Sequence, residues 1–272
     1  MKITNINKLS AKGGSASGGK DLIVFDVDGT LAPTKSEMDR EMVELFKQLL
    51  RVKKVAVISG AKYEIMKMQL AGSLKASPNL LRNLFLFPTT ATTFLRYNHG
   101  WKKVYALTLS PAKVKKIKYA FERTFKETGY EHPKKVYGEL IENRGSQVSF
   151  SFLGQDVVKV LGKKGIKMKE DWKAKNTPLK MMIARHVAQY LPEFEIHAAG
   201  FTTIDVTNKG IDKAYGVRQI QKHLHVPIKK MLFVGDAIFK GGNDYAVVKS
   251  GVDYIPVKDP GDTKKIIRYL LK

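Results

Sequence analysis

The chain has 272 residues, no cysteine and a formal net charge of +23, from 48 Lys and Arg against 25 Asp and Glu. This length suits one large domain or two modest ones, and the lack of cysteine excludes disulfides and thiolate metal sites. No apolar run is long enough to span a membrane and the first residues lack a secretory signal, so we expect a cytoplasmic protein with no membrane contact. The basic residues are scattered and accompany no groove-entering motif, which favours a lysine-rich surface over a nucleic-acid site.

The first third of the chain alternates strand and helix patterns. Residues 1–20 end in Gly, Ser and Lys without apolar spacing and predict a flexible tail. After them, "DLIVF", "KKVAVISG" and "NLFLFP" are short apolar runs typical of buried strands, while "SEMDREMVELFKQLL" and "EIMKMQLAG" have helical spacing. Strands and helices in alternation with short connections predict parallel crossover units.

The middle of the chain has a different pattern. "QVSFSFLG" alternates apolar and polar residues strictly, which predicts a half-buried strand, and "FEIHAAG" and "TTIDVT" predict further strands. "TPLKMMIARHVAQYL" predicts a helix that begins at Thr177, with Pro178 in its first position. The first pattern then returns, with "MLFVGD" as another buried strand.

These patterns together predict an α/β protein. Its core would be a Rossmann-like parallel sheet built from residues 21–100 and 201–272, interrupted by an inserted α+β domain at residues 101–200.

The stretch "FDVDGTL" places Asp26 and Asp28 where the first apolar run ends. Functional groups of parallel sheets gather at such strand ends. Two carboxylates this close repel each other unless a cation or a shared proton intervenes, and Mg²⁺ prefers oxygen ligands. The following Gly-Thr allows a tight turn and offers the Thr30 hydroxyl to an anion. The alternative is a pair of aspartates that merely caps a helix.

Three further polar residues follow the same kind of apolar run. Ser59 follows the apolar pair of "VISG", Asp236 ends "MLFVGD", and Lys213 in "GIDKAYG" begins the helix that leads to that last strand. A hydroxyl, a carboxylate and a lysine at strand ends or adjacent loops would meet Asp26 and Asp28 in one crevice.

The motifs "DVDGT", "VISG", "DKAYG" and "GDAIFKGGND" together resemble the haloacid-dehalogenase superfamily of phosphotransferases, over residues 21–272. The resemblance implies that Asp26 is a nucleophile that forms an aspartyl phosphate and that Asp28 is the general acid and base. It also implies phosphate contacts from Thr30, Ser59 and Lys213.

The same resemblance implies Mg²⁺ as cofactor. The metal would be bound by the carboxylates of Asp26 and Asp236 and the backbone carbonyl of Asp28, with Asn243 and Asp244 in support. A glycine-rich loop with a helix cap is the alternative for the last two residues.

The insertion between the Ser59 and Lys213 motifs resembles the α/β cap of one branch of the superfamily, the sugar phosphatases and eukaryote-like phosphomannomutases. The phosphomannomutase family gives the closest resemblance, carried by "HPKKVYGELIENRGSQVSFSFLG", "TTIDVTNKGIDKAYG" and "GGNDYAVV". It implies a phosphorylated sugar substrate and a possible homodimer through the cap. It further implies substrate contacts from Lys35, Arg144, Thr203 and Asp205. Arg144 has the alternative of a surface ion pair with Glu142 or Glu139.

Two positions depart from that family. Lys35 stands where the family has an arginine, and Gln155 stands where its second cap arginine would be, with Lys159, Lys163 and Lys164 as the nearest cations. A mutase must hold a sugar bisphosphate in two orientations, and arginine binds phosphate in a bidentate way that lysine and glutamine cannot reproduce.

We therefore expect a magnesium-dependent phosphatase of sugar phosphates slightly ahead of a phosphomannomutase that interconverts mannose 1-phosphate and 6-phosphate and also accepts glucose phosphates. A basic nucleic-acid-binding protein is the non-enzymatic alternative.

Overall fold

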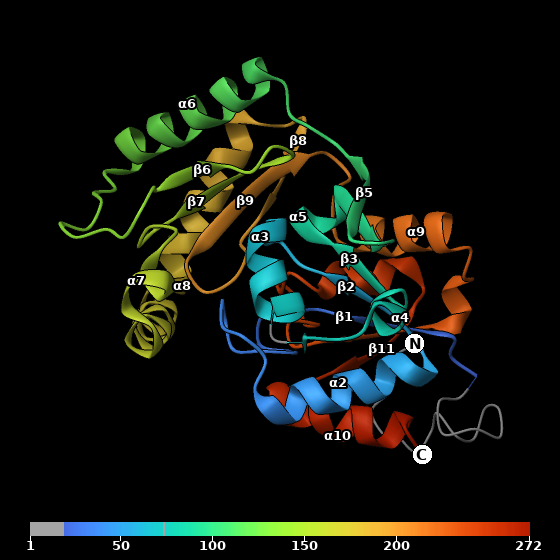
Figure 1. Cartoon of the computed structure of the whole chain (residues 1–272). Helices are drawn as coiled ribbons and strands as arrows, with labels where there is room; N and C mark the ends of the chain where they lie inside the picture. Colours follow the sequence, from blue (N-terminus) through green and yellow to red (C-terminus); the bar gives the residue numbers. More distant parts are fainter. Residues whose placement is uncertain (1–18, 73) are drawn as a thin grey trace. The chain divides into compact units, whose positions relative to one another are not determined.

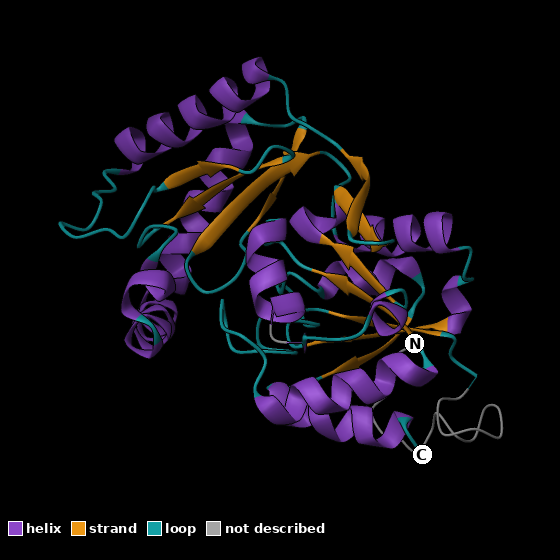
Figure 2. Cartoon of the chain, viewed as in Figure 1, coloured by secondary structure: helices purple, strands orange, loops and turns teal. Residues whose placement is uncertain are grey.

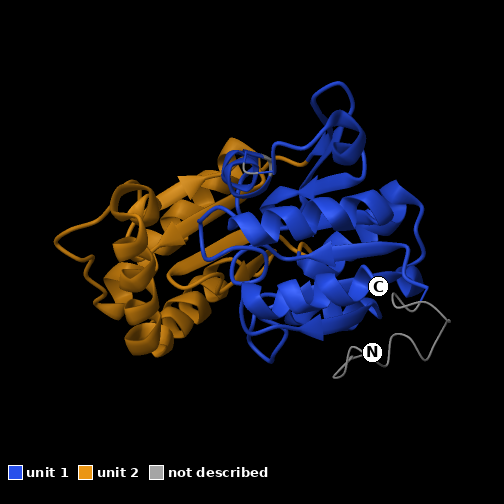
Figure 3. Ribbon diagram, turned by 60° about the horizontal axis from the view of Figure 1, so that its bottom comes forward, with its two compact units in different colours: residues 1–106, 212–272 blue, residues 107–211 orange. Residues whose placement is uncertain are grey.

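The computed structural model describes residues 19–72 and 74–272, so the predicted tail lies outside the described residues apart from its last two positions. The chain forms two compact units (Figure 3). The first comprises the described residues up to 106 together with residues 212–272, and the second comprises residues 107–211. Among the described helices, none combines the length and the apolar character that a membrane span requires.

The first unit is built on a seven-stranded sheet (Figure 1). Its strand order is β11-β10-β1-β2-β3-β4-β5; neighbours from β11 to β3 are parallel, and β4 and β5 are antiparallel additions. The predicted α/β fold with a parallel-rich core is therefore confirmed. The strands are β1 (Leu22–Phe25), β2 (Lys54–Ile58), β3 (Leu84–Phe87), β4 (Thr93–Tyr97), β5 (Trp101–Ala106), β10 (Met231–Gly235) and β11 (Asp253–Pro256).

Helices cover both faces of this sheet (Figure 2). Ile23 and Phe25 of β1 pack on one face with α2 and α10, while Leu22 and Val24 pack on the other with α9. Because both faces are covered, β1 is a continuous apolar run with no exposed side chain. The helical segments are α2 (Arg40–Val52), α3 (Tyr63–Met66), η1 (Lys67–Gly72), α4 (Pro78–Leu81), α5 (Pro88–Ala91), α9 (Lys213–Leu224), η2 (Ile228–Lys230), η3 (Tyr245–Ser250) and α10 (Pro260–Leu270).

The second unit is a four-stranded antiparallel sheet in the order β6-β7-β9-β8. Phe150 of β7 and Val206 of β9 belong to an apolar core that also contains Phe121 of α6 and Ile183 of α8. The opposite side chains of the same strands are polar. The elements are α6 (Pro111–Thr128), β6 (Ile141–Asn143), β7 (Gln147–Ser151), α7 (Val157–Leu161), α8 (Lys163–Tyr190), β8 (Phe194–His197) and β9 (Thr203–Asn208).

The units divide the chain six and eleven residues later than the predicted boundaries of 100 and 200. Residues 101–106 form β5, which pairs with β4 and so remains in the first sheet. At the other end, β9 pairs with both β7 and β8, so residues 203–208 belong inside the second sheet.

The predicted start of a helix at Thr177 is wrong. Helix α8 begins at Lys163 and runs through Pro178 to Tyr190. The Thr177 hydroxyl does not cap a helix start but donates to the Lys173 carbonyl, 2.7 Å away and one turn earlier. A proline loses one helical hydrogen bond, and helix-favouring residues before it and packing after it outweigh that loss here.

Candidate active site

Three polar residues of the first unit follow the ends of neighbouring parallel strands. Phe25 of β1 lies opposite Val57 of β2 and Val234 of β10, so the residues after these strands lie along one edge of the sheet. The Asp26 amide continues the pairing by donating to the Val234 carbonyl at 3.0 Å. The parallel register therefore places Asp26, Ser59 and Asp236 along the same edge.

The residues Asp26, Asp236 and Asp244 form a carboxylate cluster. One oxygen of each lies within 4.8 Å of the others. Lys213, the first residue of α9, enters the cluster: its Nζ donates to Asp26 Oδ1 at 2.5 Å and also to Asp244 Oδ1. The second Asp244 oxygen accepts from the Ala237 amide at 3.1 Å. Segments far apart in the sequence thus meet in one cluster.

Burial dominates the electrostatics of this cluster. Asp26, Lys213 and Asp244 are each at most 4% exposed. Burial raises the pKa of Asp26 well above its usual range, with Lys213 opposing the shift and Asp244 adding to it. Burial and the Asp244 carboxylate raise the pKa of Asp236 to about 6. For Lys213, burial lowers the pKa, but Asp244 and Asp26 outweigh it and raise the pKa.

The turn after β1 is shaped around the same cluster. Gly29 has a φ of +81°, and a Cβ added there would lie 2.5 Å from Asp236 Oδ2, so no larger residue fits without displacing that carboxylate. The Thr30 hydroxyl is buried and has no hydrogen-bond partner among the described residues. Buried hydroxyls normally have a hydrogen-bond partner, so the Thr30 hydroxyl is suited to donate a hydrogen bond to a bound anion.

Ser59 lies at the end of β2, 2% exposed. Its Oγ accepts from the Ala61 amide at 3.0 Å, and its carbonyl accepts from the Thr90 amide at 2.9 Å. Because the Ser59 Oγ is only an acceptor in this bond, its hydroxyl can donate a hydrogen bond to an anion. Thr89, Thr90 and Ala91 all have positive φ, so the backbone that holds the Ser59 loop is left-handed over three non-glycine residues.

The Asp28 carboxylate is outside the carboxylate cluster. Its Oδ1 accepts from the Lys35 backbone amide at 2.7 Å and from Gln69 Nε2 at 2.9 Å. The structure therefore gives Asp28 partners different from those of Asp26. Asn243 is partly buried and immediately precedes Asp244 in the loop after β10.

In the second unit, the predicted substrate residues Arg144 and Asp205 belong to one buried polar cluster. Arg144 donates through Nε to Glu142 Oε2 at 2.8 Å and through Nη2 to Gln155 Oε1 at 2.9 Å, and its Nη1 lies 3.9 Å from Asp205 Oδ1. Asp205 also accepts from the Ser149 hydroxyl. The ion pair between Arg144 and Glu142, which the sequence left as an alternative, is thus present. Thr203, half-buried, begins the strand that carries Asp205.

Sequence analysis missed two residues at these sites. Gln69 touches Asp28, but its pattern predicts only a helix. Lys180 of α8 is 5% exposed, and its Nζ donates to the Gly200 carbonyl at 2.9 Å. Burial and the charge of Lys173 lower the pKa of Lys180 to about 8, against the opposing effect of Asp205. The available signal was its helical spacing from Ile183, which places a lysine on the apolar face.

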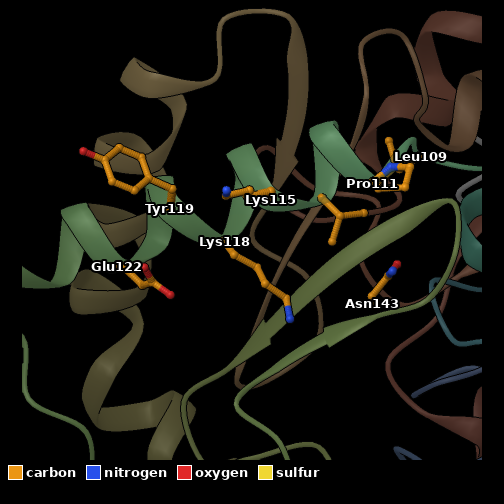
Figure 4. Close-up of a pocket in the computed structure, with 8 residues that line it drawn as sticks. Leu109, Pro111, Lys115, Lys118, Tyr119, Glu122 and Asn143 are labelled. Carbon is orange, nitrogen blue, oxygen red and sulfur yellow. The ribbon is translucent and has the colours of Figure 1, made fainter.

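A hollow of about 510 Å³ lies elsewhere on the second unit (Figure 4). None of the predicted site residues lines it. Its walls are Leu109, Pro111, Val114, Lys115, Lys118, Tyr119, Glu122 and Asn143.

Comparison with known proteins places this site in a family. Residues 23–250 match the family described as haloacid dehalogenase-like hydrolase, so the chain belongs to that family. The phosphomannomutase of Encephalitozoon cuniculi is 27% identical over 264 residues, which cover 93% of this chain and 94% of that protein. The Spinacia oleracea phosphomannomutase is 24% identical, over 84% of this chain and 86% of that protein.

Two solved structures have a similar fold. An N-terminally truncated Plasmodium falciparum IMP-nucleotidase bound to IMP gives a TM-score of 0.70 at 16% identity, covering 98% of this chain and 71% of that one. The Aspergillus fumigatus trehalose-6-phosphate phosphatase gives 0.56 at 15% identity, covering 99% of each chain. Family and fold together confirm the predicted recognition and make this chain a phosphotransferase enzyme. The predicted homodimer and cytoplasmic location stay predictions.

Proposed function

We propose that this enzyme is a magnesium-dependent phosphatase of sugar phosphates that works through an aspartyl phosphate on Asp26. The buried carboxylate cluster carries the proposal. Three carboxylates around a single ammonium leave excess negative charge at a largely buried site, in which Asp26 and Asp244 are buried and Asp236 is partly buried. Such a site is stable only if protons or a further cation balance it.

The cluster suits Mg²⁺ because all of its donor atoms are oxygens. Asp26 and Asp236 are the proposed ligands, with the Asp28 carbonyl, and Asp244 and Asn243 support them. When bound, the ion would keep Asp26 ionised and neutralise charge on the phosphoryl oxygens.

The remaining chemistry belongs to side chains of the first unit. An Asp26 carboxylate oxygen attacks phosphorus and the bond from phosphorus to the sugar oxygen breaks, while Asp28 gives its proton to that leaving oxygen. Asp28 then takes a proton from water, whose oxygen attacks phosphorus and releases Asp26. Lys213, Ser59 and the unpartnered Thr30 hydroxyl hold the phosphoryl oxygens during both displacements.

The polar cluster of the second unit favours hydrolysis over isomerisation. Arg144 is bound to Glu142 and Gln155 and lies beside Asp205, so carboxylates largely neutralise it. Gln155 is itself committed, since its Nε2 also donates to the Ser149 carbonyl at 3.0 Å. A second, distant phosphate would have to displace these contacts, whereas a sugar monophosphate needs no such site.

The test is phosphate release from a panel of sugar monophosphates, with Mg²⁺ and after chelation. The wild-type protein should release phosphate only with the metal, and Asp26→Asn should lose at least about 10³-fold in kcat because the nucleophile is gone. Full turnover by Asp26→Asn would disprove the assignment of the nucleophile.

A phosphomannomutase is the second candidate, favoured by the two curated relatives described above. Incubation with mannose 1-phosphate and a trace of sugar 1,6-bisphosphate separates the two. Free phosphate as the main product supports the phosphatase, and rapid formation of the 6-phosphate would reverse the order.

A further inference from the structure

The Asp28 carboxylate is anchored through only one of its oxygens. Both of its hydrogen bonds, from the Lys35 amide at 2.7 Å and from Gln69 Nε2 at 2.9 Å, go to Oδ1. In the described part of the chain, Oδ2 receives none. A carboxylate held in this way keeps one oxygen fixed and the other available for proton transfer.

Gln69 is an unusual residue for its surroundings. It is fully buried, between Met66 and Leu70, which belong to the apolar core of the first unit. A buried amide in such a place costs stability unless its polar atoms are bonded. Gln69 forms one such bond, from Nε2 to Asp28 Oδ1.

The backbone around Gln69 is unusual as well. Residues Lys67–Gly72 form η1, a π-helix, a conformation that is rare and frequent at functional sites. The Gln69 carbonyl accepts from the Met38 amide at 3.3 Å. Gln69 therefore binds the loop that follows β1 at two points, near its start through Asp28 and near its end through Met38.

From these contacts we infer that Gln69 is the positioning residue of the acid and base Asp28. This inference rests on the proposed function. The amide fixes Oδ1 and so restricts rotation of the carboxylate, which leaves Oδ2 to exchange the proton in both displacements. Because the Gln69 amide is neutral, it fixes Asp28 without adding a second cation that would compete with Lys213 for the carboxylates of the cluster.

The test replaces Gln69 by methionine, which has a similar volume, suits the apolar core and lacks the donor. Gln69→Met should lower kcat by about 10–100-fold with little change in KM, because a misdirected catalytic group slows the chemistry and not binding. The matched control is Asn83→Asp, which removes another amide donor of the first unit, bonded to the Leu50 carbonyl at 2.9 Å. The control should change melting temperature and leave kcat near the wild-type value.

A double-mutant cycle with Asp28→Ala gives the second readout. If Gln69 acts through Asp28, Gln69→Met should lower kcat no further in the Asp28→Ala background. An equal loss in both backgrounds, or wild-type kcat in Gln69→Met, would overturn the inference. These outcomes differ from failure of the proposed function, in which wild-type protein releases no phosphate or Asp26→Asn remains active.

Discussion

The two units of this enzyme differ in how they handle charge and backbone strain. In the first, Asp26, Asp236 and Asp244 surround the single ammonium of Lys213. In the second, Arg144 and Lys180 are matched by Glu142 and Asp205.

The backbone shows the same division. Non-glycine residues with positive φ all belong to the first unit in the described ranges 19–72 and 74–272. The left-handed non-glycine residues and the cluster with excess carboxylates therefore both belong to the first unit, which also carries the proposed active site.

Removing Lys213 should have the largest effect on this comparison. Lys213→Met leaves the buried carboxylates of Asp26 and Asp244 without their ammonium partner, and we expect the free energy of unfolding to fall by about 3–5 kcal/mol in metal-free buffer. Added Mg²⁺ should restore part of the loss, because the proposed metal site uses the same oxygens. Denaturant unfolding with and without Mg²⁺ measures both effects.

Two controls accompany Lys213→Met. Lys265→Met removes a surface partner of Asp262 and should leave stability nearly unchanged. Arg144→Met should destabilise the protein, but Mg²⁺ should not restore it. Equal rescue of Arg144→Met by Mg²⁺ would contradict the division of roles between the units.

The positions of the proposed active-site residues were predictable because they depend on strand ends. Apolar runs define β1, β2 and β10. Parallel pairing of these strands then places Asp26, Ser59 and Asp236 at one edge of the sheet, independently of the loop conformations. The alternating pattern likewise identified the strand β7, but the predicted half-burial is wrong, because all five residues of the strand are buried.

What the sequence could not predict depends on tertiary contacts. No local pattern distinguishes the π-helix around Gln69 from an ordinary helix, because the two differ only in hydrogen-bond register. Lys180 lies on an apolar helix face, and the sequence offers no partner for it. Only the fold brings its ammonium to the Gly200 carbonyl. Helix α8 passes through Pro178 because packing outweighs a local stop signal.

Lys180 provides a smaller test, through pH. Its pKa falls from 10.5 in the unfolded chain to about 8 in the folded one, so between these values the unfolded chain binds more protons. Stability should therefore rise with pH across this window, and the charged lysine should cost about 3 kcal/mol near pH 7.

Lys180→Met serves as the reference because it lacks the titrating group. The difference in melting temperature, wild type minus Lys180→Met, should move in favour of wild type as pH rises from 8 to 10. A constant difference would show that burial does not lower the pKa of Lys180.

The smallest expected effect concerns the left-handed turn beside Ser59. Thr90 has φ 56° and ψ 42°, a conformation that β-branched residues rarely adopt and that asparagine tolerates. Thr90→Asn should raise unfolding free energy by about 1 kcal/mol. The Thr90 amide would still donate to the Ser59 carbonyl, so kcat should not change.

Thermal unfolding and kcat measured on the same Thr90→Asn sample distinguish two reasons for the strain. Higher stability with unchanged kcat would mean that the backbone amide of residue 90 is enough to hold the Ser59 loop and that the threonine side chain is not required. Higher stability with lower kcat would mean that the strain itself holds the Ser59 hydroxyl in place. Lower stability would contradict the assignment of strain to Thr90. It would mean that the contacts of the threonine side chain stabilise the fold by more than its left-handed backbone conformation costs.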